Sequence, residues 1–184
     1  MMLRELLPDM PVPAIAIQGI CEDSRRVKSG DLFCAVAGER TDGRDHIAAA
    51  IGNGAAAVLG EAPLPEMSNP LVPMVAVEGL RSRMSEIAGR FYGHPSEALS
   101  VFAVTGTNGK TSFSQLLAQA LSSASVKCGM IGTMGSGVPG ALIDAGLTTP
   151  AAIDIQRKLR EFVDSDCEAV VLEASSHGLV QGRL

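Results

Sequence analysis

The feature that most constrains this chain is an apolar segment that runs into a glycine-containing turn ending in Lys-Thr. Residues 101–104 are apolar without interruption, and residues 105–111 read Thr-Gly-Thr-Asn-Gly-Lys-Thr. Four consecutive apolar residues predict a strand buried on both faces, and apolar positions at helical spacing over 112–121 predict a helix. A turn between such elements points unpaired N–H groups and the helix dipole at an anion. The run therefore predicts a phosphate-binding loop for a nucleoside triphosphate.

Each residue type in this loop has its own use. Gly106 and Gly109 let the backbone approach a phosphate. Lys110 adds a positive charge, and the hydroxyl of Thr111 can ligate magnesium. The strict pattern G-x-x-x-x-G-K-[ST] asks for glycine at position 104, where this chain has Val104. The alternative is an ordinary turn that happens to contain Gly-Lys-Thr, but the strand before it and the helix after it favour a nucleotide site.

Composition excludes several other classes. The chain has 184 residues, 46% of them hydrophobic, and a net charge of -5, which suits one or two globular domains. Lys and Arg form no cluster and aromatic residues are only 3%, so nucleic acid is not an expected partner. No stretch approaches the ~20 apolar residues of a membrane span, and the first residues lack the apolar core of a secretion signal. We expect a cytoplasmic chain with four buried free thiols, Cys21, Cys34, Cys128 and Cys167.

The first half of the chain predicts alternating strands and helices. A short helix within residues 1–10 is followed by strands within 15–27 and at 32–37, 55–59 and 74–77, with helices at 45–51 and 80–92. The turn Gly93-His94-Pro95-Ser96 ends the last helix, and the strand of the phosphate loop begins soon afterwards. We therefore expect one domain at 1–96 and a second at 97–184.

Three strands are expected in the second domain: at 101–104, near 130–131 and at 169–172. A glycine-rich loop over 132–146 and a helix over 151–163 lie between the last two. Thr149 is expected to cap this helix and Pro150 to lie in its first turn. An equally open alternative is that Thr148 and Thr149 form a second anion-binding helix start. Glu173 follows the last strand directly, and because parallel strands end at the edge that holds the phosphate loop, its carboxylate is expected to reach the magnesium of the nucleotide.

Several segments together resemble the Mur ligases, and within them the members that form the tripeptide on UDP-N-acetylmuramoyl-L-alanyl-D-glutamate. They are Asp23-Ser24-Arg25, Gly30-Asp31-Leu32-Phe33, Asp42-Gly43-Arg44, residues 105–111, Thr148-Thr149-Pro150 and the run from Glu173 to Arg183. The resemblance implies an α/β chain: a mixed α/β domain for the UDP-sugar, followed by the truncated start of a parallel-sheet ATPase domain with a phosphate-binding loop. A further domain for the incoming amino acid would lie outside the chain.

The resemblance also implies an ATP-dependent acid-amino-acid ligase of peptidoglycan synthesis with the following site residues. ATP contacts are expected at Gly106, Thr107, Asn108, Gly109, Lys110, Thr111 and Ser112, and magnesium ligands at Thr111, Glu173 and His177. Lys110, Glu173 and His177 are the expected catalytic residues. Substrate contacts are expected at Ser24, Glu39, Arg40, Thr41, Thr148, Thr149, Ser175, Gln181 and Arg183.

Two other functions remain open at this stage. One is a sister Mur ligase or a folylpolyglutamate-type ligase, and the other is a non-catalytic module that binds a nucleotide or a UDP-sugar. For the ligase, the sequence leaves open whether lysine or meso-diaminopimelate is added. We expect small-molecule partners only, a monomeric full-length enzyme, and a 184-residue piece that binds without turnover and self-associates through an uncovered sheet edge.

Overall fold

The computed structural model describes residues 1–38, 41–66, 72–143 and 146–184. The chain forms two compact units, Met1–Phe91 and Tyr92–Leu184. The sequence places the boundary slightly later, at residue 97, after the turn that ends the last helix of the first half. Both units combine helices with parallel strands, as expected for an α/β chain.

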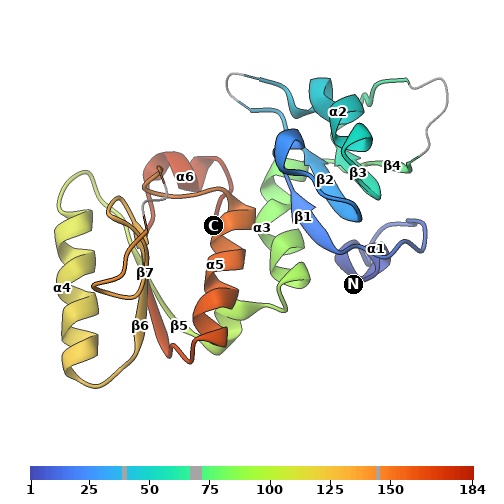
Figure 1. Ribbon diagram of the computed structural model, residues 1–184. Helices are drawn as coiled ribbons and strands as arrows, with labels where there is room; N and C mark the ends of the chain where they lie inside the picture. The colour runs from blue at the N-terminus through green and yellow to red at the C-terminus, as the bar shows by residue number, and fades with distance from the viewer. Residues whose placement is uncertain (39–40, 67–71, 144–145) are drawn as a thin grey trace. The chain divides into compact units, whose positions relative to one another are not determined.

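The first unit is built on a parallel sheet in the order β1-β2-β3-β4, so the order in space follows the order in sequence (Figure 1). Its strands are β1 (Gly19–Cys21), β2 (Asp31–Ala35), β3 (Ala57–Gly60) and β4 (Met74–Ala76). Its helices are α1 (Leu3–Leu6), α2 (Ile47–Gly52) and α3 (Leu80–Phe91), and two 3₁₀ turns are η1 (Ser24–Arg26) and η2 (Gly43–His46). Two neighbouring parallel strands must be joined by a crossover connection. The η2–α2 segment forms the crossover connection between β2 and β3.

Apolar residues of β2, β3 and α2 form the core of this unit. Phe33 and Val58 pack with Ile47 and Ala50, and all four are almost completely buried. Helix α1 contacts α3, where the guanidinium of Arg90 donates to the carbonyl oxygen of Leu6 over 2.8 Å. The first turn of the helix expected at 45–51 is the 3₁₀ turn η2, and the helix within residues 1–10 is only four residues long.

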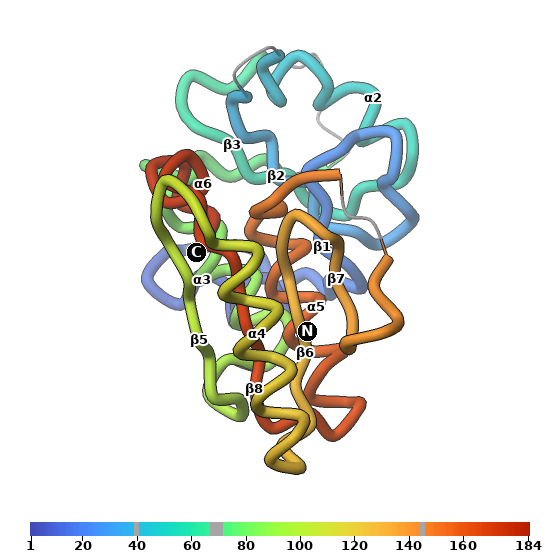
Figure 2. The backbone as a smooth tube through the Cα atoms, turned by 90° about the vertical axis from the view of Figure 1, so that its left-hand side faces the viewer, coloured from blue at the N-terminus to red at the C-terminus, as the bar shows by residue number. Residues whose placement is uncertain are grey.

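The second unit has a sheet in the order β5-β8-β6-β7, which Figure 2 shows strand by strand. Strands β5 (Ser100–Val104), β8 (Ala169–Glu173) and β6 (Cys128–Gly132) run parallel, and β7 (Gly135–Gly137) is antiparallel to β6. The helices are η3 (Pro95–Ala98), α4 (Lys110–Ser123), α5 (Ala152–Asp164) and α6 (Ser176–Val180).

Helices α4 and α5 cover opposite faces of this sheet (Figure 1). Successive residues of β8 point to opposite faces, so Val170 and Leu172 pack in the cluster that contains Phe162 of α5. Val171 packs instead in the cluster that contains Ala118 of α4. Strand β8 is therefore buried on both faces, and so is β6, whose Ile131 packs on the α5 side and whose Met130 packs on the α4 side.

Strand β5 differs from the sequence expectation of a strand buried on both faces. The side chains of Val101 and Phe102 are 41% and 39% exposed. Within the described residues β5 pairs only with β8 and lies at the edge of the sheet. Four consecutive apolar residues indicate a strand that can be buried on both faces. Whether the strand is buried depends on its position in the sheet.

Two further expectations for this unit are wrong. Helix α5 begins after Ala151 as its N-cap, and Thr149 and Pro150 precede the helix. The hydroxyl of Thr149 is used elsewhere, as described below. The strand β7 also lies inside the segment expected to be a glycine-rich loop, so the described part of this unit has four strands rather than three.

The sequence predicts that all four cysteines are buried free thiols. All four cysteines are free, but Cys21 is only half-buried. None of the helices in the described part of the chain combines the length and the apolar character needed to cross a membrane.

Candidate functional site

The register of the second sheet brings three chain segments to one edge. Val104, the last residue of β5, pairs with Glu173, the last residue of β8. Ile131 of β6 pairs with Leu172, so β6 ends beside β8 at the same level. The turns that follow these parallel strands therefore meet, as is usual for ligand sites of open α/β sheets.

The turn after β5 has the backbone of a phosphate-binding loop. Gly106 and Gly109 adopt φ angles of 144° and 79°, which residues with a side chain rarely adopt. Gly109 is the N-cap of α4, so the N–H groups of the first turn of a 14-residue helix face the loop. The ammonium group of Lys110 donates to the carbonyl oxygen of Gly106 over 2.7 Å and lies over the loop.

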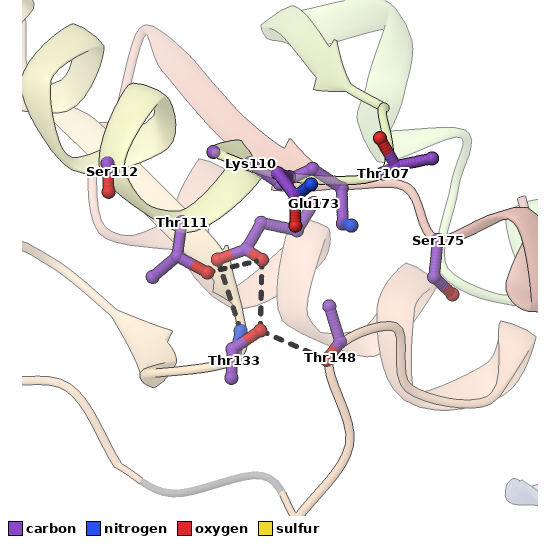
Figure 3. Close-up of a pocket in the computed structure, with 10 residues that line it drawn as sticks. Thr107, Lys110, Thr111, Ser112, Thr133, Thr148, Glu173 and Ser175 are labelled. Carbon is purple, nitrogen blue, oxygen red and sulfur yellow. Dashed lines mark hydrogen bonds between the residues drawn. The ribbon is translucent and has the colours of Figure 1, made fainter.

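The carboxylate of Glu173 lies behind this loop and is 1% exposed. Three donors hold it (Figure 3): Thr111 Oγ1 to Oε2 at 3.0 Å, Thr133 Oγ1 to Oε2 at 2.9 Å, and the Thr133 backbone N–H to Oε1 at 3.2 Å. A buried carboxylate without donors would be strongly destabilising. The two threonines make this one compatible with the core.

These groups line a cavity of about 270 Å³. Its lining residues are Thr107, Asn108, Gly109, Lys110, Thr111, Ser112, Thr133, Thr148, Glu173 and Ser175. All of them except Thr133 were expected at a nucleotide or substrate site from the sequence. Thr133 was missed, although a polar residue directly after β6 is the kind of signal that led to Glu173 after β8.

Thr149 does not line the cavity, because its side chain is turned into the protein and is 1% exposed. Its hydroxyl donates to the carbonyl oxygen of Glu173 over 2.8 Å and accepts from the backbone N–H of Ser175 over 3.0 Å. The contact that the resemblance implies between Thr149 and substrate stays a prediction, and the observed role of its hydroxyl is internal.

The other expected residues of this unit lie at the N-cap of α6, in this helix or just after it. The hydroxyl of Ser175 caps this helix by accepting from the N–H of Gly178 over 3.0 Å. His177 Nε2 and Gln181 Nε2 are 2.9 Å apart. Arg183 donates to the carbonyl oxygen of Thr149 over 2.6 Å and to the side-chain oxygen of Gln181. His177, Gln181 and Arg183 are not among the residues that line the cavity.

The substrate residues expected in the first unit follow β1 and β2. Ser24 is buried within η1, and its carbonyl oxygen accepts from the side-chain amide of Asn53 over 2.9 Å. The carbonyl oxygen of Thr41 accepts from the N–H of Gly38 over 2.8 Å. Glu39 and Arg40, which were also expected to contact substrate, lie outside the described residues.

Two Asp-x-Arg pairs shape the turns beside Ser24 and Thr41. Asp23 accepts from the backbone N–H and the guanidinium of Arg25, and Asp42 does the same with Arg44. The hydrogen bond from the Arg25 side chain is the main reason why the pKa of Asp23 falls to about 2. The bond from the Arg44 side chain likewise lowers the pKa of Asp42. Both turns are thus fixed by a charged pair.

The donor set around Glu173 fits magnesium better than a softer metal. Thr111 and Glu173 offer a hydroxyl and a carboxylate, and magnesium prefers oxygen ligands together with phosphate. Because the single proton of Thr111 points at Glu173, the lone pairs of its hydroxyl remain for a cation. Within the described residues no group of three or more His, Cys, Asp and Glu side chains could hold a metal. Thr111 and Glu173 would hold magnesium together with a phosphate oxygen of the nucleotide.

The parallel sheet, the glycine turn and the helix that follows define the class of α/β proteins with a phosphate-binding loop. Sequence comparison identifies the family. The Mur ligase family, catalytic domain, matches residues 16–92, and the Mur ligase middle domain matches residues 104–184. The chain therefore belongs to the Mur ligase family.

Individual relatives agree with this assignment. The UDP-N-acetylmuramoyl-L-alanyl-D-glutamate–2,6-diaminopimelate ligase of Ectopseudomonas mendocina (strain ymp) is 50% identical over 100% of this chain and 38% of its own length. The ligase of the same name from Pseudomonas aeruginosa is 48% identical over the same shares. A solved structure of a ligase of this name superposes with a TM-score of 0.82 at 32% identity and covers 100% of this chain and 38% of its own. The chain thus spans 38% of the length of these relatives.

Proposed function

We propose that this chain provides the ATP-binding and UDP-sugar-binding parts of a ligase that adds diaminopimelate to UDP-N-acetylmuramoyl-L-alanyl-D-glutamate. The observation that carries the proposal is the cavity in which the phosphate-binding loop and the buried Glu173 face each other. The names of the similar ligases support this peptide as the substrate and favour diaminopimelate over lysine as the added amino acid.

The proposed reaction has two steps. An oxygen of the side-chain carboxylate of the D-glutamate residue attacks the γ-phosphorus of ATP, and ADP leaves as an acyl phosphate forms. The amine of diaminopimelate then attacks the acyl carbon, gives up a proton and displaces phosphate as the amide bond forms. The first step brings two anions together, so its catalysis depends mainly on positioning and on positive groups near the transferred phosphoryl group.

The residues of the cavity suit the first step. The ammonium of Lys110 and the N–H groups at the start of α4 are the positive groups available to the phosphates. Thr111 and Glu173 are the residues that would hold magnesium, which would neutralise phosphate charge when bound. Thr148 and Ser175 also line the cavity and are the groups that we assign to the peptide end of the second substrate.

The first unit is proposed to bind the uridine end of that substrate through the turns at Ser24 and Thr41. Both turns follow the carboxyl ends of parallel strands and are fixed by the Asp23–Arg25 and Asp42–Arg44 pairs. We assign this role to residues 1–96 and nucleotide binding to residues 97–184. Because ATP and UDP-sugars are metabolites of the cytoplasm, this is also the proposed location of the protein.

A binding experiment on the 184-residue chain tests the proposal. Equilibrium dialysis with labelled ATP, with and without magnesium, is expected to show binding that magnesium strengthens. A parallel titration with UDP-N-acetylmuramoyl-L-alanyl-D-glutamate is expected to show a second, independent binding event. Absence of both events would overturn the proposal. The complete gene product, supplied with both substrates and either diamino acid, is then expected to yield the diaminopimelate tripeptide by mass spectrometry.

A further inference from the structure

Among the described residues that line the cavity, Thr133 is the only one to which the sequence assigned no role, and it makes three hydrogen bonds there. Its backbone N–H donates to Glu173 Oε1 at 3.2 Å, and its hydroxyl donates to Glu173 Oε2 at 2.9 Å. The same hydroxyl lies 3.0 Å from the hydroxyl of Thr148 (Figure 3). Thr133 therefore joins the buried acid at the end of β8 to the loop that precedes α5.

We propose that Thr133 is a positioning residue that fixes the carboxylate of Glu173 and ties it to Thr148, so that the nucleotide and peptide sides of the cavity are held as one unit. The inference rests on the proposed function, because the proposed function assigns the loop residues of the cavity to ATP and assigns Thr148 and Ser175 to the peptide substrate. Thr133 acts through Glu173 and Thr148 rather than on the reacting atoms.

The directions of these hydrogen bonds follow from counting protons. A threonine hydroxyl has one proton and two lone pairs, and a carboxylate only accepts. The hydroxyl of Thr133 gives its proton to Glu173, so the bond between the threonines must be donated by Thr148. These hydrogen bonds form a relay in which Thr148 donates to Thr133 and Thr133 donates to Glu173.

This direction determines what the cavity can recognise. Because Thr148 has given its proton to Thr133, its hydroxyl can only accept from a ligand in the cavity. It therefore suits a donor, such as an amide N–H of the peptide, and does not suit a phosphate or carboxylate oxygen. Thr111 likewise gives its proton to Glu173 and presents lone pairs. Thr133 keeps both hydroxyls oriented, because it accepts from Thr148 and fixes the carboxylate that accepts from Thr111.

A second observation supports positioning as the role of this segment. A Cβ atom on Gly132, the residue before Thr133, would lie 2.3 Å from Glu173 Oε1 and 2.6 Å from its Cδ. At the end of β6, Gly132 therefore leaves space for the carboxylate of Glu173, and Thr133 holds this carboxylate by hydrogen bonds. The rest of Thr133 is exposed, so its substitution does not disturb the core.

The test compares ATP binding by the wild-type chain and by Thr133→Val, which keeps the shape of the side chain and removes its hydroxyl. The quantity measured is the gain in ATP affinity on adding magnesium. Loss of a group that orients a metal ligand typically costs about 10- to 100-fold in metal affinity. We expect Thr133→Val to lower the magnesium-dependent gain by about this factor and to leave metal-free ATP binding unchanged. Thr133→Ser keeps the hydroxyl and is expected to restore most of the gain.

The matched control is Met134→Ala, which changes the next residue. In the wild type, Met134 is 56% exposed and does not line the cavity. This variant should bind ATP as the wild type does. Thr148→Val tests the other end of the relay: it should lower the gain in the wild-type background and add nothing in the Thr133→Val background, because the two residues act in series.

The outcomes separate this inference from the proposed function. If the wild-type chain binds no ATP, the proposed function fails. If it binds ATP but Thr133→Val keeps the full magnesium-dependent gain, the positioning role of Thr133 is wrong. Equal weakening with and without magnesium would also overturn it, because that pattern indicates a damaged loop. Should Thr133→Val not fold, the single Thr148→Val variant decides, and an unchanged gain there would refute the relay.

Discussion

The backbone of Gly132 lies directly against the carboxylate of Glu173, so that a Cβ atom at this position would be 2.3 Å from Oε1. No real Cβ makes such a contact, and one of the two groups would have to move. The added Cβ would also lie 2.6 Å from Cδ and 2.8 Å from Cγ of Glu173, so it meets the side chain of Glu173 and not its backbone, whereas Gly132 belongs to a buried strand. The carboxylate would therefore move and the sheet would stay.

The first prediction is that Gly132→Ala folds but lowers the magnesium-dependent gain in ATP affinity by about 10- to 100-fold, because the carboxylate no longer reaches its position. Equilibrium dialysis with and without magnesium measures this. Gly52→Ala is the control, since no atom lies within 4 Å of a Cβ built there. A full magnesium effect in Gly132→Ala would show that the position of Glu173 does not matter for the metal.

The second prediction concerns Lys110, whose ammonium group reaches only the carbonyl oxygen of Gly106 among the contacts described. Lys110→Ala is expected to weaken ATP binding by about tenfold or more, because one charge-assisted contact contributes about 1.5–3 kcal/mol. The amide NMR spectrum should stay dispersed, since the side chain is not part of the core.

Lys127→Ala is the matched control for this variant. Its ammonium also donates to a backbone carbonyl oxygen, that of Ser165 at 2.5 Å, but it lies just before β6, at the end away from the cavity. ATP affinity should be unchanged. Equal losses in the two variants would mean that the effect comes from net charge rather than from the loop.

The phosphate-binding loop and Glu173 could be predicted from the sequence because both depend on local patterns. Apolar runs locate β5 and β8, and the parallel-sheet rule places the residues that follow them at one edge. The exposure of Val101 and Phe102 could not be predicted, because an apolar run does not specify how many neighbours a strand has. Helix α4 covers one sheet face, but β5 lies at the edge.

Other parts of the site escaped prediction for different physical reasons. Strand β7 has the sequence Gly-Ser-Gly, which carries no apolar alternation and depends on pairing with β6. Thr149 has the residue type of an N-cap, yet its hydroxyl finds partners across the sheet edge in Glu173 and Ser175. A partner 24 or 26 residues away in sequence leaves no local signal.

The third prediction is that the turns of Ser24 and Thr41 contact the UDP-sugar. In the ¹⁵N-labelled 184-residue chain, adding UDP-N-acetylmuramoyl-L-alanyl-D-glutamate should shift the amide signals of residues near these turns. The controls are UDP and GDP, which share the ribose diphosphate and differ in the base: UDP should shift the same signals and GDP should not. Shifts confined to residues 97–184 would count against a uridine site in the first unit.

The fourth prediction follows from the pKa of Asp23, which the Arg25 side chain lowers from 3.8 to about 2. A pKa lowered by folding means that the ionised form is favoured in the folded state. The pair therefore contributes stability above about pH 3.8 that is lost as the pH falls to about 2. A carboxyl-carbon NMR titration of Asp23 should give a midpoint near this lower value.

Arg25→Met should move that midpoint upward, towards 3.8, because the side-chain hydrogen bonds are gone while the bond from the Arg25 backbone N–H remains. Arg26→Met is the matched control, because the side chain of Arg26 affects the pKa of Asp23 only through its charge, and this is the smallest of the causes. It should move the midpoint much less. Equal shifts in both variants would assign the effect to charge alone.

The last prediction concerns Thr149, whose hydroxyl links the end of β8 to the start of α6 through Glu173 O and Ser175 N. Thr149→Val keeps the shape and leaves a buried carbonyl and a part-buried N–H without this partner. Such a loss costs about 1–3 kcal/mol, so the amides of β8 and β6 should exchange with solvent faster by the corresponding factor. Thr148→Val, which removes a hydroxyl at the cavity, should leave this exchange nearly unchanged. If Thr149→Val instead kept normal exchange but lost binding of the UDP-sugar peptide, Thr149 would be a substrate ligand and its internal role would be secondary.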